Sequence, residues 1–245
     1  MKSFLLRSLG ALLACLWLGT AQASVIISAT RVIYPAQERE VTVQLSNQGR
    51  TPALVQAWLD TGDASAEPHA TQVPFSISPA MFRLDPDKGQ ALRLIHSREP
   101  LPNDRESLFW LNVLEIPPRL GAEEAGGNHL QMAIRQRIKV MFRPAGLPGS
   151  AVQALQGVQW TLLREGRGWQ LQADNRSPFY VNLGEVNLVL GARSYAAGAG
   201  FVAPFGQQRF AVEGAEGLQP DQAQVSVIAI NDHGAGVPLR QALSR

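Results

Sequence analysis

The sequence predicts an all-β fold built from two sandwich domains. Short runs that alternate apolar and polar residues recur between turn signals, a pattern typical of strands with one buried face. No long amphipathic helical pattern interrupts them. The 245 residues exceed the roughly 100 to 150 residues of a common single domain. Two domains are therefore expected, and one large β domain is the alternative.

The first element, residues 1–23, is expected to be a signal peptide that is removed. Lys2 and Arg7 flank the start of an apolar run at residues 9–19, and Ala21-Gln22-Ala23 places small residues where a signal peptidase cleaves. The apolar run is shorter than the about 20 residues that span a bilayer. The sequence therefore predicts export across the membrane without stable insertion in it.

Cys15 is the only cysteine of the chain and lies within this leader. It follows Leu12-Leu13-Ala14, which approximates a lipid-attachment site, but Leu13 is bulky where a smaller residue is usual. A lipoprotein is therefore the lesser alternative. The mature chain would carry no cysteine in an oxidising compartment, so its fold must depend on packing. Removal of the leader leaves 20 basic residues against 20 acidic ones, a balance that does not support a nucleic-acid partner.

Strands of the first domain are expected at six alternating runs, 25–34, 40–46, 54–59, 91–96, 108–116 and 130–142. Turn chemistry separates them at residues 47–49, 85–89 and 126–128, where glycine supplies positive φ and proline a preset angle. The alternation of run 54–59 places Trp58 at an interior position of a central strand. We interpret Trp58 as a core residue.

A hinge is expected at residues 143–150, which contain two prolines and two glycines directly after a long strand. The domains would span 24–145 and 146–245. Strands of the second domain are expected at 158–163, 169–173, 180–190, 207–212 and 224–230. Glycines around 191–200 and 214–217 predict irregular loops there.

The run 130–142 carries two different faces. Its even positions form an almost unbroken apolar row, so a partner or a core must cover them. Its odd positions include Arg135, Arg137 and Lys139, which by pattern alone would be the solvated face of the strand.

Residues 101–117 carry a specific pattern. It includes Leu101-Pro102, the charged turn Asp104-Arg105-Glu106, the aromatic Trp110 with Asn112, and Ile116-Pro117. This stretch resembles the signature of the periplasmic pilus-assembly chaperones of the chaperone/usher pathway. The resemblance implies two immunoglobulin-like sandwiches in a boomerang arrangement. It also implies a periplasmic chaperone that binds, folds and caps pilus subunits by donor-strand complementation and delivers them to an outer-membrane usher.

The resemblance extends to residues that would bind the subunit. Residues 138–144 resemble the family's subunit-binding strand with Lys139 as its anchor, and residues 29–35 resemble the segment that supplies the partner arginine, Arg31, after Thr30. These residues would bind the C-terminal carboxylate of a subunit. Leu130, Met132 and Ile134 would be the apolar side chains that the strand lends to the subunit.

Two further features follow from the resemblance. Arg93, Glu106 and Asp232 lie at positions that resemble the family's buried charge cluster between the domains, and Asp232 is identified by the stretch 230–234. The short glycine-containing loop between Pro117 and Asn128 resembles the short-loop subclass. An exposed edge strand invites aggregation, which the family commonly prevents by self-capping oligomers.

The sequence contains no motif that predicts an enzyme active site. The four histidines are scattered without helical pairing, and no serine-nucleophile motif is present. We therefore expect no catalytic residues, no metal and no cofactor. The expected partners are pilin subunits, an outer-membrane usher and a second copy of the chain. The main alternative function is a structural or adhesive immunoglobulin-like surface module. A carbohydrate-binding protein is less favoured, because the five tryptophans are too few to indicate one.

Overall fold

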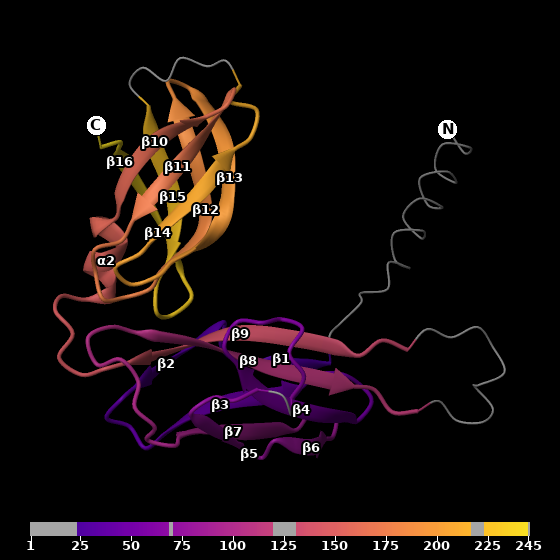
Figure 1. Cartoon of the computed structure of the whole chain (residues 1–245). Helices are drawn as coiled ribbons and strands as arrows, with labels where there is room; N and C mark the ends of the chain where they lie inside the picture. The colour runs from indigo at the N-terminus through magenta and orange to yellow at the C-terminus, as the bar shows by residue number, and fades with distance from the viewer. Residues whose placement is uncertain (1–23, 69–70, 120–130, 217–222, 245) are drawn as a thin grey trace, which may run out of the picture.

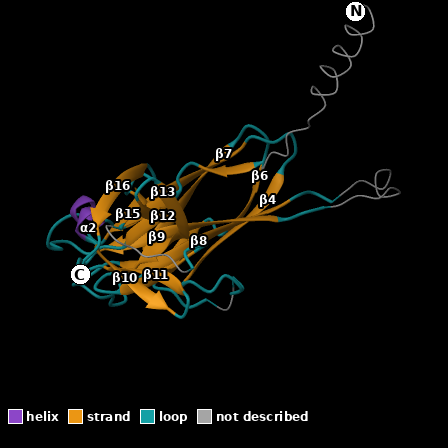
Figure 2. Cartoon of the chain, turned by 90° about the horizontal axis from the view of Figure 1, so that it is seen from above, coloured by secondary structure: helices purple, strands orange, loops and turns teal. Residues whose placement is uncertain are grey.

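The structure, a computed structural model, describes residues 24–68, 71–119, 131–216 and 223–244. Two β-sandwiches meet at an angle like the arms of a boomerang (Figure 1). Strands make up almost all of the regular structure of the described residues, and one short helix, α2, is present among them (Figure 2). The predicted all-β, two-sandwich fold is confirmed.

The first sandwich pairs a sheet of four strands with a sheet of five. The smaller sheet has the order β1 (Val25–Ile27), β3 (Glu40–Asn47), β7 (Gly89–His96), β5 (Phe75–Ser78). The larger sheet has the order β2 (Arg31–Pro35), β9 (Ile134–Arg143), β8 (Ser107–Ile116), β4 (Ala53–Asp60), β6 (Met81–Leu84). Alternate residues of both sheets, such as Leu92, Val55 and Val140, fill the core between them.

The second sandwich follows a linker and helix α2 (Ala151–Gly157), whose N-cap Ser150 accepts a hydrogen bond from the Gln153 N–H at 3.3 Å. One of its sheets has the order β10 (Gln159–Glu165), β11 (Gly168–Asp174), β14 (Gln207–Val212). The other has the order β13 (Arg193–Val202), β12 (Val181–Leu190), β15 (Gln224–Ile230), β16 (Gly236–Ala242). Trp160 and Leu171 are fully buried between the two sheets.

The first predicted run breaks into two strands that belong to different sheets. β1 pairs with β3, whereas β2 pairs in parallel with β9. The break falls at residues 28–30, so the chain crosses from one layer to the other just before Arg31. This crossing places Arg31 beside Lys139, the first matched pair of β2 and β9.

The prediction of irregular loops around residues 191–200 is wrong, because most of that stretch forms β13. Its backbone pairs with β12 from Arg193 to Val202, and the pairing contains register shifts near Val186. Gly198 lies at this irregularity with a φ of 95°, a conformation that glycine adopts without steric cost. Backbone hydrogen bonds to a buried neighbour outweigh the low strand propensity of glycine here.

The prediction that Trp58 belongs to the sandwich core is also wrong. Its neighbours Ala57 and Leu59 point into the core, so Trp58 points out of the opposite face of the sheet. Trp58 is nevertheless only 7% exposed. The guanidinium of Arg135 covers it, 4.7 Å from a ring centroid of the indole.

Candidate functional site

The candidate site begins with an unpaired edge on β9. All of β9 from Ile134 to Phe142 pairs with β8, but β2 pairs only with the part from Lys139 onward. Along residues 134–138, no strand among the described residues pairs with the outer edge of β9. An edge with free backbone N–H and C=O groups is a template for an added strand.

The apolar side chains at the start of this edge are solvent-exposed. Met132 is 64% exposed and Ile134 is 36% exposed. Farther along the same face, Val140 and Phe142 enter the core of the first sandwich. Leu130, the third residue expected to contact a subunit, lies outside the described residues. The face therefore changes from open to buried along a single strand.

The open edge ends at two cations. The parallel pairing of β2 with β9 sets Arg31 opposite Lys139. The Lys139 ammonium turns toward the second sandwich, donates to Oδ1 of Asn182 at 2.5 Å, and lies 4.5 Å from the ring centroid of Phe201. β9 lies on the side of the first sandwich that faces the second (Figure 1). The anchor residues predicted from the sequence thus lie in the angle between the domains.

Arg31 and Thr30 contact the hairpin turn between β15 and β16. Nη1 of Arg31 donates to the carbonyl of Ile230 at 3.4 Å, while the buried Nε has no hydrogen-bond partner among the described residues. Gly234, with a φ of 83°, approaches Thr30 so closely that an added Cβ would lie 2.2 Å from its Oγ1. The second domain therefore supplies part of the surroundings of Arg31.

The electrostatics of this pair favour an anionic ligand. Burial, and to a lesser degree the charge of Arg31, lowers the pKa of Lys139 to about 8. Burial also lowers the pKa of Arg31, against an opposing effect of the Asp232 carboxylate. Two partly desolvated cations side by side disfavour each other's charge, and a carboxylate between them would remove that penalty.

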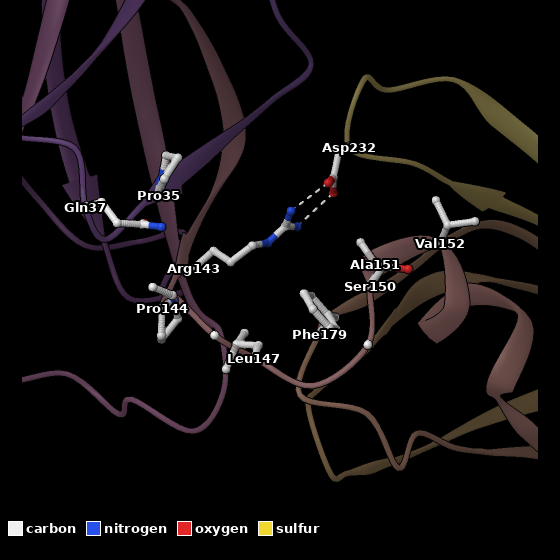
Figure 3. A pocket seen from close by; sticks show the side chains of 13 residues that line it. Pro35, Gln37, Arg143, Pro144, Leu147, Ser150, Ala151, Val152, Phe179 and Asp232 are labelled. Carbon is white, nitrogen blue, oxygen red and sulfur yellow. Dashed lines mark hydrogen bonds and ion pairs between the residues drawn. The ribbon is translucent and has the colours of Figure 1, made fainter.

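The interdomain charge cluster forms, but around a different arginine from the one predicted. Arg143, the last residue of β9, donates from Nε to Glu106 at 2.6 Å and from Nη1 and Nη2 to Asp232 at 2.7 and 2.9 Å. The dashed lines of Figure 3 mark the paired contacts to Asp232. Glu106 also accepts from the backbone N–H of Tyr180 at 2.6 Å. The end of β9, the residue before β8 and the turn between β15 and β16 thus meet at one guanidinium.

Arg93 does not belong to this cluster. It lies exposed on β7 in the other sheet of the first sandwich, opposite Thr42 and Ser78. The alternation of β7 directs Leu92 and Leu94 into the core and Arg93 to solvent. One sequence signal could have identified Arg143. It lies at the end of the strand that carries Lys139, and because the two residues are four positions apart, they share one face of that strand.

We expect Arg93→Ala to leave stability unchanged within about 0.5 kcal/mol, because exposed substitutions away from caps and buried pairs usually do so. Urea denaturation followed by tryptophan fluorescence measures this. A loss of several kcal/mol would contradict the placement of Arg93 outside the charge cluster.

A cavity of about 400 Å³ lies beside the charge cluster. Figure 3 shows Pro35 and Gln37 on the side of the first domain and Phe179 and Val152 on the side of the second, with Arg143 pointing across toward Asp232. The guanidinium of Arg143 also lies 5.3 Å from the ring centroid of Phe179. At this point of the interface, Arg143 therefore bridges the two domains beside an open space, in addition to the contacts that Arg31 and Lys139 make with the second domain.

Both halves of the chain match profiles of one protein family. Residues 24–148 match the N-terminal domain of PapD, described as a pili and flagellar-assembly chaperone, and residues 153–241 match the C-terminal domain of the pili assembly chaperone PapD. The chain belongs to the pilus-assembly chaperone family. Its role is that of a chaperone in pilus assembly.

Individual relatives agree with this assignment. The chaperone is 40% identical over 217 residues to the probable fimbrial chaperone YadV of Escherichia coli K12, covering 88% of each chain. It is 39% identical over 241 residues to the chaperone protein FimB/FhaD of Bordetella pertussis, covering 97% of this chain and 95% of that one.

Solved structures resemble the chaperone over both domains. The crystal structure of YadV has a TM-score of 0.78 at 36% identity, covering 90% of this chain and all of that one. SafB of Salmonella enterica, solved in complex with the SafA pilin, has a TM-score of 0.74 at 28% identity, covering 92% and 99%. In the described part of the chaperone, no helix is long and apolar enough to cross a membrane.

Proposed function

We propose that this chaperone binds pilus subunits by lending β9 to their incomplete fold, with the subunit's C-terminal carboxylate held by Arg31 and Lys139. The observation that carries the proposal is the open edge along residues 134–138, which ends at that cation pair. The relative SafB, solved with a pilin, supports the subunit as the class of partner.

The direction of the incoming strand follows from β2. β2 starts at Arg31 and runs parallel to β9. A partner strand that lies in line with β2 and ends where β2 begins would also run parallel to β9. Its last residue would then lie next to Arg31 and Lys139, where its carboxylate meets two donors.

The two parts of the site have different energetic roles. Burial of each apolar side chain, Met132 and Ile134 among them, is worth about 1.5 to 3 kcal/mol. Each charge-assisted hydrogen bond to the carboxylate is worth about 1.5 to 3 kcal/mol. The anchor also fixes register, because a slip of one residue would turn every apolar side chain of the strand to the wrong face.

The cellular role proposed with this mechanism is that of a periplasmic carrier. The chaperone would take subunits after export, keep their open groove covered, and release them at an outer-membrane usher when the next subunit supplies a better packed strand. Before a subunit binds, a second copy of the chain would cover the same edge.

A periplasmic pull-down of the tagged mature chain beside Lys139→Ala tests the proposal. We expect a pilin subunit, identified by mass spectrometry, to copurify with the wild type and to be lost from the variant. A folded wild type that retains no pilin would favour the structural or adhesive surface module instead.

Binding of a peptide carboxylate is expected to weaken as the pH rises through about 8, the pKa of Lys139. Below this pH the ammonium is charged and attracts the carboxylate, and above it the neutral amine does not. Isothermal titration of a synthetic β-strand peptide with a free C-terminus measures the change. The Lys139→Ala variant should lack this dependence, and a flat wild-type profile through the same interval would contradict the anchor role.

A further inference from the structure

The outer face of the larger sheet in the first domain carries a ladder of arginine, tryptophan and buried polar side chains. We call the six residues that form it the arginine–tryptophan ladder: Trp58 and Asp60 of β4, Trp110 and Asn112 of β8, Arg135 and Arg137 of β9. Three of them are deeply buried, with exposed fractions of 7% for Trp58, 1% for Asp60 and 0% for Asn112. A solvated strand face would not bury a carboxylate and an amide in this way.

The ladder has two steps of the same construction. In the first, Arg135 stacks on Trp58 and donates from Nε and Nη2 to Oδ1 of Asn112 at 2.9 and 2.7 Å. In the second, Arg137 stacks on Trp110 at 4.4 Å from a ring centroid and forms an ion pair with Asp60.

The two steps are joined at their buried ends. Nδ2 of Asn112 donates to Oδ2 of Asp60 at 2.7 Å. Hydrogen bonds from Arg137, Asn112 and the Gly62 N–H lower the pKa of Asp60 although its burial opposes ionisation. A buried carboxylate held by several donors fixes both arginines on the sheet.

The ladder lies directly behind the open edge. Arg135 and Arg137 alternate with Ile134 and Ile138 in the part of β9 that lacks a β2 partner. Ile134 and Met132 are exposed, so this end of the strand gains little from core packing on its even face. On that face Gln136 donates to the Val25 carbonyl and Ile138 packs against the core, so the end of the strand at Ile134 depends mainly on its β8 pairing and on its other face.

We infer that the arginine–tryptophan ladder positions the open edge of β9, holding residues 134–138 flat and in register so that their apolar face is presented to a partner strand. Arg135 and Arg137 are thus positioning residues for subunit binding and not merely a solvated face. This inference rests on the proposed function for its consequence in binding, while its effect on the strand itself can be measured in the free protein.

The arginine–tryptophan ladder and the carboxylate anchor would act on a partner strand in different ways. Lys139 acts on the partner's terminal charge, so its removal should matter only for a partner with a free carboxylate. Arg137 acts on the shape of the strand, so its removal should weaken a partner strand whether or not its C-terminus is charged. Comparing a free-acid peptide with its amidated form therefore distinguishes the two roles.

Arg137→Met is the test variant, and Arg164→Met is its matched control. Arg164 stacks on Trp169 at 5.7 Å in the second domain, so the control removes the same kind of contact far from β9. Because Arg137→Met leaves the buried Asp60 with only the longer ion pair to Arg135, at 3.7 Å, the double variant Asp60→Asn/Arg137→Met is measured as well. The probes are one synthetic peptide of alternating valine and serine, free and amidated at its C-terminus.

We expect faster hydrogen exchange in residues 134–138 of both Arg137 variants, with β12 unchanged, and about tenfold weaker binding of both peptide forms. Lys139→Ala should weaken the free-acid peptide only, and Arg164→Met should change neither property. Unchanged exchange in residues 134–138 of the folded variants would overturn the inference, as would a loss confined to the free-acid peptide. A wild type that binds neither peptide would count against the proposed function, and the exchange measurement would still decide the role of the ladder.

Discussion

Arg143→Ala is expected to lower the free energy of unfolding by about 3 to 5 kcal/mol, the usual cost of removing one partner of a buried ion pair. The Glu106 side chain is only 1% exposed, so the substitution leaves its carboxylate buried without its counterion. It also removes the two contacts to Asp232 that join the domains. Urea denaturation monitored by tryptophan fluorescence measures the loss.

Two variants serve as comparisons for Arg143→Ala. Asp232→Ala should cost less, because the side chain of Asp232 is 34% exposed and solvent screens its charge. Arg83→Ala removes an exposed pair with Asp85 and should be nearly neutral. Equal midpoints for Arg143→Ala and the wild type would mean that the charge cluster does not hold the domains together.

Met132→Asp and Ile134→Asp are expected to weaken subunit binding by about a hundredfold or more each, without loss of stability. The side chains of Met132 and Ile134 are 64% and 36% exposed in the single chain, so a carboxylate at either position can stay in contact with water until a subunit binds. On binding, the variant loses about 1.5 to 3 kcal/mol of apolar burial and must also desolvate a charge. Titration of a purified pilin subunit and thermal denaturation measure the two quantities.

Met81→Asp is the matched control for these substitutions. Met81 is 56% exposed and belongs to β6, at the opposite edge of the same sheet. The same chemical change there should leave subunit binding intact. If Met81→Asp weakened binding as much as Met132→Asp, general charge repulsion rather than the edge of β9 would explain the result.

The sequence was a good guide to elements whose pattern is strong and local. Alternation predicted most of the longer strands, with β13 and β16 as exceptions. The resemblance of residues 29–35 and 138–144 predicted that Arg31 and Lys139 belong to one site, and the parallel pairing of β2 with β9 places the two residues side by side. Strands such as β5 and β6, with four residues each, were missed because a short edge strand carries too little alternation to stand out.

The errors arose where pairing or layer assignment decides the outcome. Trp58 is buried as the sequence suggests, yet by Arg135 and not by the core, because alternation cannot say which face of a strand a stacking cation will cover. The sequence does not distinguish Arg93 from Arg143, because both are arginines on strands. Only the arrangement of the two domains brings Arg143, and not Arg93, to Asp232. Asn182 had no signal of its own, since its contact with Lys139 crosses the domain boundary.

A carboxylate anchor at Arg31 and Lys139 is tested by titrating one β-strand peptide into the wild-type chaperone and into Lys139→Ala. The peptide is used with a free C-terminal carboxylate and in its amidated form. We expect the wild type to bind the free-acid peptide at least about tenfold more tightly than the amidated form, since a charge-assisted hydrogen bond contributes about 1.5 to 3 kcal/mol. Lys139→Ala should bind both forms alike. Equal affinity of the wild type for the two peptides would contradict a carboxylate anchor at Arg31 and Lys139.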